Sequence, residues 1–104
     1  MDIKPLLSEL KAGLQTLYGS RLRGVYLFGS YARGTSEPDS DVDVLIVLDE
    51  VAWYGREIDR TGDLISTLSL RFGVSVSRVF VSAADWATGE NPFLLSVRGE
   101  AIAA

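Results

Sequence analysis

Two apolar runs flank a polar segment that contains a glycine–serine pair and, ten residues later, a pair of aspartates. The runs, 24–28 and 44–48, are rich in β-branched and aromatic residues, which predicts two buried strands. Side chains alternate along a strand, so Asp41 and Asp43 project together. Two neighbouring carboxylates repel each other unless a cation lies between them, and such oxygen ligands suit Mg²⁺. The aspartate pair therefore predicts a magnesium site where the second strand begins.

The glycine–serine pair, Gly29 and Ser30, directly follows the first predicted strand. A glycine at this place lets the backbone approach a ligand closely. The free N–H groups that open the next helical turn attract anions. We therefore expect a phosphate-binding turn on the same cleft as the aspartates, which is the layout of a nucleoside triphosphate site.

The segments 29–34 (GSYARG) and 40–43 (SDVD), with their spacer, resemble the signature of the minimal nucleotidyltransferases of the DNA polymerase β-like superfamily. The resemblance extends over nearly the whole chain. It implies an α+β fold with an α-β-β-α-β core, in which a small mixed β-sheet has helices packed against it. It also implies a set of site residues: Gly29, Ser30, Arg33 and Ser40 at the nucleotide phosphates, and Asp41 and Asp43 as catalytic residues that hold Mg²⁺.

Three residues of this signature also have a structural interpretation. Ser30 is a candidate helix N-cap, which is compatible with phosphate binding because a phosphate binds at the same position. Arg33 pairs either with the triphosphate or, in the empty site, with Asp39 or Asp41. Ser40 either orients the Asp41 carboxylate or only forms the turn, and the sequence does not distinguish the two.

The third predicted strand departs from the family pattern. Family enzymes usually carry a third carboxylate there, which aids deprotonation of the acceptor hydroxyl. Residues 74–81 (VSVSRVFV) contain no Asp or Glu, and Ser77 and Arg78 occupy the part of the strand where that acid is expected. The two-metal Mg²⁺ site implied by the resemblance is therefore expected to be incomplete.

The resemblance implies a Mg²⁺-dependent nucleotidyltransferase that binds an NTP, with ATP as the expected donor, and transfers AMP to a hydroxyl. Minimal nucleotidyltransferases commonly act as antitoxins of HEPN-domain RNase toxins, which they silence by attaching AMP to a tyrosine. It therefore implies a HEPN-type toxin as partner in a hetero-oligomer. The alternative is a catalytically weak or inactive member of the fold that neutralises its partner by binding alone.

Length and composition narrow the class of protein further. A chain of 104 residues predicts one domain over residues 1–104. The absence of Cys and His excludes disulfides and Cys- or His-ligated metals. The formal charge of −4 opposes a long nucleic acid as partner, because such binding depends on Lys and Arg meeting phosphates. No apolar run is long enough to span a bilayer and no signal-peptide pattern is present, so we expect a cytoplasmic location.

The spacing of apolar residues predicts two long helices. The first covers residues 3–17 and ends at Gly19, and the second runs from about Arg56 to Phe72 and ends at Gly73. The pair 91–92 (NP) opens a final short helical piece. Three aromatic residues belong either to the core or to a partner surface: Trp53, Tyr54 and Trp86.

Overall fold

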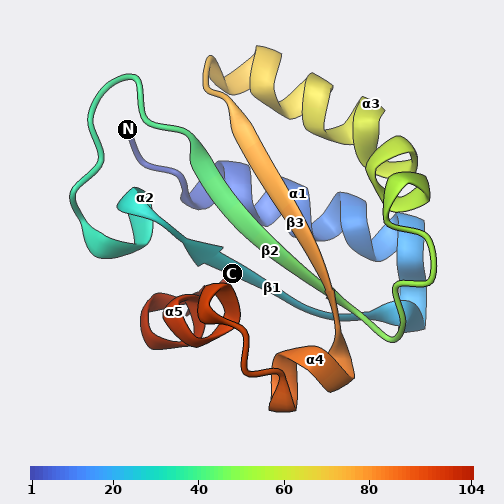
Figure 1. Ribbon diagram of the computed structural model, residues 1–104. Helices are drawn as coiled ribbons and strands as arrows, with labels where there is room; N and C mark the ends of the chain where they lie inside the picture. Colours follow the sequence, from blue (N-terminus) through green and yellow to red (C-terminus); the bar gives the residue numbers. More distant parts are fainter.

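Four strands form one mixed sheet in the order β3-β2-β1-β4 (Figure 1), and the computed structural model describes residues 1–104. β1 (Leu22–Phe28) and β2 (Val42–Leu48) are antiparallel neighbours. β3 (Val76–Ser82) runs parallel to β2, and the short β4 (Ile102–Ala103) runs antiparallel to β1. The predicted α+β fold with a small mixed sheet is confirmed.

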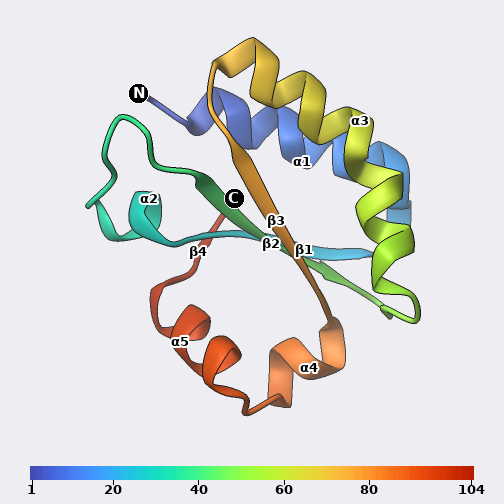
Figure 2. The same ribbon diagram turned by 45° about the horizontal axis from the view of Figure 1, so that its top comes forward.

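The helices lie in two layers, with α1 and α3 on one face of the sheet and α4 and α5 on the other (Figure 2). α2 is a single turn that connects β1 to the loop before β2. No helix combines the length and the apolar composition that crossing a membrane requires. The helical segments are α1 (Lys4–Tyr18), the 3-10 turn η1 (Gly19–Arg21), α2 (Ser30–Arg33), α3 (Tyr54–Phe72), α4 (Ala83–Thr88) and α5 (Pro92–Glu100).

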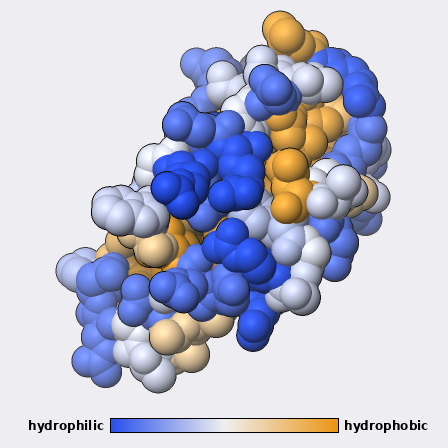
Figure 3. Space-filling model, turned by 90° about the vertical axis from the view of Figure 1, so that its right-hand side faces the viewer, coloured by the Kyte–Doolittle hydropathy of each residue, from blue (hydrophilic) through white to orange (hydrophobic).

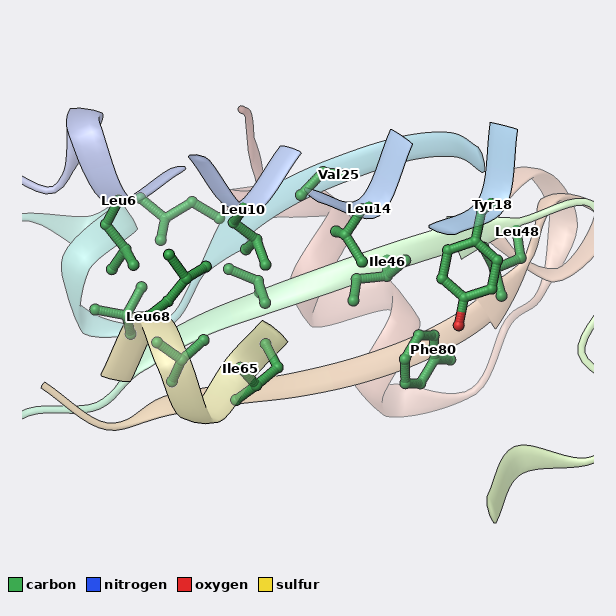
Figure 4. Close-up of a cluster of buried hydrophobic side chains, with 14 residues drawn as sticks. Leu6, Leu10, Leu14, Tyr18, Val25, Ile46, Leu48, Ile65, Leu68 and Phe80 are labelled. Carbon is green, nitrogen blue, oxygen red and sulfur yellow. The ribbon is translucent and has the colours of Figure 1, made fainter. Parts of the chain in front are cut away.

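The larger hydrophobic core lies between the sheet and the pair α1 and α3 (Figure 4). α1 contributes Leu6, Leu10 and Leu14, which share one face because they are spaced four residues apart on a helix of 3.6 residues per turn. β2 contributes Val44 and Ile46, which alternate along the strand and so point to the same side. All five side chains are fully buried.

The opposite face of the sheet carries a smaller core beneath α4 and α5. β2 contributes Leu45 and Val47 to it, and α5 contributes Leu94 and Val97. β2 is therefore buried on both faces, which explains why residues 44–48 are continuously apolar instead of alternating with polar residues. Asp43 belongs to this second face, where it interrupts the apolar pattern at the start of the strand.

Glycines end the two long helices at the predicted positions. Gly19, with φ of 55°, follows α1, and Gly73, with φ of 65°, follows α3. Positive φ favours glycine because it has no Cβ to collide with the backbone. The pair 91–92 also opens α5 as predicted, and the Asn91 side chain caps the helix by accepting a hydrogen bond from the Leu94 N–H at 2.9 Å.

Several element boundaries, including the starts of β1 and β2, differ by one or two residues from the sequence prediction, and one strand was not predicted. α3 begins at Tyr54, two residues early. β3 begins at Val76 because the Val74 N–H still donates to the Ser69 carbonyl of α3, at 3.2 Å. β4 lies in the final alanine-rich residues, which carry no strand pattern of their own and pair with β1 only through the tertiary fold.

The three aromatic residues left open by the sequence have different surroundings. Trp86 is partly buried, and its ring lies 4.9 Å from the Tyr26 ring. The Tyr54 hydroxyl accepts a hydrogen bond from the Phe80 N–H, whereas Trp53 is 68% exposed. The side of the molecule that includes α3 is mostly hydrophilic, with separate hydrophobic areas (Figure 3). Trp86 therefore packs against the smaller core, whereas Trp53 is exposed to solvent.

Candidate active site

The two aspartates lie at the start of β2. Val42 and Val44 are fully buried on the face of α1 and α3, so Asp43 projects to the other face, beside α5. Asp43 is half-buried and pairs in register with Phe28 of β1. Asp41 precedes the strand and is exposed. The sheet thus positions one aspartate rigidly and leaves the other open to solvent.

The electrostatics of the pair favour a bound cation. Burial raises the pKa of Asp43 above its ordinary value of 3.8, and the negative charge of Asp41 raises it further. The positive charge of Arg33 partly opposes this shift, while Glu100 adds to it. A divalent cation between the two carboxylates would relieve both their repulsion and the cost of burying the Asp43 charge. Hard oxygen donors of this kind fit Mg²⁺.

Gly29 lies directly against Asp43. Its φ is 76°, and a Cβ atom at this position would overlap the Asp43 Oδ2 atom and lie 3.1 Å from its Cγ. The Gly29 carbonyl accepts hydrogen bonds from the N–H groups of Ala32 and Arg33, both at 3.1 Å, which start α2. Only glycine satisfies both the backbone conformation and this contact. The turn after β1 therefore meets the aspartate side of the sheet without an intervening side chain.

Ser30 is the first residue of α2, and its side chain makes no capping hydrogen bond. The N-cap position belongs to Gly29 instead, so the N-cap interpretation of Ser30 is wrong. The start of a helix leaves N–H groups without partners inside the helix, and these groups favour anions. Ser30 lies at that start, one residue after the glycine that contacts Asp43.

Arg33 forms an ion pair with a residue far from it in the sequence. Its Nη1 lies 2.8 Å from Oε2 of Glu100, at the end of α5. The predicted pairing with Asp39 or Asp41 in the empty site is therefore wrong. No local signal points to Glu100, because 67 residues separate it from Arg33 and only the fold brings them together. Arg33 is 53% exposed in this pair, which leaves it accessible to a ligand.

Ser40 forms a turn with Glu37. Its Oγ accepts a hydrogen bond from the Glu37 N–H at 2.8 Å, and its own N–H donates to the Glu37 carbonyl at 3.0 Å. The hydroxyl therefore shapes the loop before β2. The structure favours the turn interpretation of this serine over contact with the Asp41 carboxylate.

The register of β2 and β3 identifies the residue where a third carboxylate is expected. Asp43 pairs with Ser77, which is exposed on the same face of the sheet. Arg78 turns to the other face, where its Nε donates to Thr61 Oγ1 and its Nη2 donates to the Ile58 carbonyl, both at 2.8 Å. A neutral hydroxyl thus lies beside Asp43. No group of three or more His, Cys, Asp or Glu side chains is placed to hold a metal ion.

The largest hollow of the molecule is not at these residues. It has a volume of about 900 Å³ and lies against α1, with Leu7, Leu27 and Tyr31 among its lining residues. Leu27 belongs to the core on the face of α1 and α3, away from Asp43. The candidate site is instead an open part of the sheet face, between the turn after β1 and the start of β2.

A family model described as a nucleotidyltransferase domain matches residues 7–85, which include the glycine–serine pair and both aspartates. The Methanocaldococcus jannaschii protein MJ0141, provisionally named a protein adenylyltransferase, is 35% identical over 79 residues, which are 76% of this chain and 79% of that protein. Protein adenylyltransferase MntA of Thermococcus cleftensis is 37% identical over 70 residues, which are 67% of this chain and 69% of that protein.

A solved structure shares the fold. The crystal structure of a toxin–antitoxin with AMP-PNP superposes with a TM-score of 0.63 and 19% identity, over 90% of this chain and 68% of that chain. Family match, sequence relatives and fold therefore agree. This chain belongs to the nucleotidyltransferase domain family, and protein adenylyltransferases are among its relatives.

Proposed function

We propose that this protein is a Mg²⁺-dependent nucleotidyltransferase that transfers AMP from ATP to a hydroxyl of a partner toxin of the HEPN type. The observation that carries the proposal is the contact between Gly29 and Asp43, which joins a phosphate-binding turn to a carboxylate pair. The relatives named protein adenylyltransferases support AMP as the transferred group. The toxin–antitoxin with AMP-PNP supports both the nucleotide and a toxin as the partner.

Each residue of the site has a distinct role in this proposal. Asp41 and Asp43 hold the cation, and the Ser30 hydroxyl and neighbouring N–H groups bind the β- and γ-phosphates. Arg33 exchanges Glu100 for a phosphate oxygen, and Ser40 holds the loop that precedes the aspartates. Bound Mg²⁺ supplies charge neutralisation at the phosphates and alignment of the attacking and leaving oxygens.

In the reaction, the acceptor hydroxyl oxygen forms a bond to the α-phosphorus, and the bond from that phosphorus to pyrophosphate breaks. The hydroxyl proton must leave as this happens. Ser77 beside Asp43 is not a base at neutral pH. The proton therefore passes to water or to a side chain of the partner, and we expect transfer to be slow.

The neutral Ser77 supports a second candidate function, in which the protein neutralises its partner by binding alone. Loss of a general base costs about 10²–10⁴ in rate. A protein of this fold that lacks the general base can still bind its partner, even when its rate of AMP transfer is negligible. The two candidates predict different states of the toxin.

Incubation of the purified toxin with this protein, ATP and Mg²⁺, followed by intact-mass spectrometry, distinguishes the two. We expect mass additions of whole AMP units that disappear in Asp41→Asn and Asp43→Asn. Asp39→Asn is the matched control, because Asp39 is an exposed aspartate of the same loop outside the proposed metal site. A toxin that is inhibited but unmodified would establish the binding function instead.

Co-expression with the protein encoded next to this chain tests the partner itself. We expect one shared peak in size-exclusion chromatography, since this chain carries a net charge of −4 and complementary charge favours a more basic partner. Separate elution of the two proteins would contradict the antitoxin role.

A further inference from the structure

We propose that the cleft between the edge strand β3 and the start of α5 binds the base of the nucleotide. This inference rests on the proposed function and adds the site of the base to it. The cleft has a volume of about 390 Å³, which is within the range of small-molecule sites. Its walls come from three parts of the chain: β3, residues 51–54 at the start of α3, and the region from α4 to the first turn of α5.

The cleft and the candidate site share one face of β3. Ser77 lies beside Asp43, and Val79, two residues further along β3, lines the cleft. Residues two apart on a strand share a face and are about 6.6 Å apart. A nucleotide whose α-phosphate lies at Asp43 can therefore extend along this face and place its base against Val79.

An exposed aromatic ring continues the same surface. Phe28 pairs in register with Asp43, and the Phe93 ring packs edge-on against the Phe28 ring, with 5.7 Å between the ring centroids. Phe93 also lines the cleft and is 43% exposed. An exposed ring at this position leaves an apolar surface uncovered, and a planar base that stacks on an aromatic ring would cover it.

Two polar side chains at the cleft provide a donor and an acceptor for a base edge. Asn91 uses its Oδ1 to cap α5 through the Leu94 N–H, so its amide N–H groups are available as donors. The Asp85 carboxylate lines the cleft and has neither a hydrogen bond nor an ion pair. An apolar surface with a few convergent polar groups is the usual composition of a ligand site.

The test compares binding of Mg²⁺–ATP with binding of Mg²⁺–tripolyphosphate, which has no base, by calorimetry. We expect the wild-type protein to bind ATP at least about fivefold more tightly, because a base that stacks on an aromatic ring contributes at least that much. Val79→Phe fills the cleft and Phe93→Ala removes the ring. Both variants are expected to bind the two ligands with nearly equal affinity.

Tripolyphosphate affinity serves as the internal control of folding, since both variants should bind it as the wild type does. Leu95→Phe is the matched control variant, because Leu95 is 55% exposed on α5 and does not line the cleft. Equal affinity of the wild type for ATP and tripolyphosphate would overturn this inference alone, as would an unchanged ratio in both variants. Binding of neither ligand would overturn the proposed function, and this inference with it.

Discussion

At the scale of single residues, the contact between Gly29 and Asp43 couples the phosphate turn to the carboxylate pair. Gly29→Ala places a Cβ into the Asp43 carboxylate as well as straining a backbone with φ of 76°. We expect this variant to lose Mg²⁺–ATP binding in calorimetry. We also expect it to lose more than the roughly 1–3 kcal/mol of stability that its glycine-specific backbone conformation, with ψ of −158°, costs by itself, measured by urea unfolding.

Gly34→Ala is the control for backbone strain. Gly34 also has a positive φ, 74°, but its ψ of 21° places it in the left-handed helical region, whereas Gly29 has a ψ of −158°, and no atom lies within 4 Å of the position of the Gly34 Cβ. This variant should lose only about 1–2 kcal/mol and keep its nucleotide affinity. Unchanged Mg²⁺–ATP binding in Gly29→Ala would show that the contact with Asp43 does not make Gly29 important for the nucleotide.

The pairing of Ser77 with Asp43 identifies the position at which a third carboxylate can be restored. Ser77→Asp should raise AMP transfer to the toxin, by up to about 10²–10⁴, because it supplies a base beside the metal site. Transfer is measured by intact-mass spectrometry over time. If the rate does not change, the missing carboxylate is not what limits the reaction.

Arg78→Asp is the comparison for that restoration. The arginine lies on the other face of the sheet and donates to Thr61 and Ile58 beneath α3. The substitution removes these hydrogen bonds and places a carboxylate close to the core, so we expect lower stability and no gain in transfer. A gain in transfer in this variant would contradict the register of β2 and β3.

At the scale of elements, the ion pair between Arg33 and Glu100 ties the end of α5 to α2 across the candidate site. Glu100→Gln frees Arg33 for the triphosphate and removes a negative charge that acts on Asp43. We expect Mg²⁺–ATP to bind up to about fivefold more tightly, since an exposed ion pair is worth up to about 1 kcal/mol. Calorimetry of both proteins measures the difference.

Glu90→Gln is the matched control, because Glu90 is an exposed carboxylate in the connection between α4 and α5 and forms no ion pair. Its nucleotide affinity should equal that of the wild type. Weaker ATP binding in Glu100→Gln would reverse the interpretation: Glu100 would then hold Arg33 in place for the phosphate instead of competing with it.

At the scale of the whole molecule, the raised pKa of Asp43 makes folding stability depend on pH. The folded protein holds the Asp43 proton more tightly than the unfolded chain does, so this group lowers stability as the pH rises through and above its ordinary value of 3.8. Asp43→Asn removes the effect. We expect the variant to be more stable than the wild type at pH 7, with a difference that disappears below about pH 3.8.

Urea unfolding of both proteins across this pH range measures the effect. Mg²⁺ at pH 7 should stabilise the wild type and leave Asp43→Asn nearly unchanged, since a ligand stabilises only a folded state that binds it. A wild type that is more stable than the variant at every pH would show that the aspartate pair is not strained in the absence of a cation.

Much of the fold follows from patterns that are short in sequence. The 3.6-residue spacing of Leu6, Leu10 and Leu14, and the glycines at 19 and 73, predict the two long helices and their ends. Two apolar runs predict the central hairpin. These features depend on local backbone preferences and on the burial of one face, and both can be recognised within a few residues. That residues 1–104 form one domain stays a prediction, as do the roles of the six site residues.

The helices, the central strands and the chemistry of the glycine–serine and aspartate pairs can all be recognised in the amino-acid sequence, because each depends on neighbours along the chain. The position of Ser77 beside Asp43 and the ion pair between Arg33 and Glu100 depend instead on how the elements pack together. Both are contacts between residues more than 30 positions apart, set by strand register and by where α5 packs. A shift of one residue in register would reverse the faces of Ser77 and Arg78, and nothing local to either residue specifies that register.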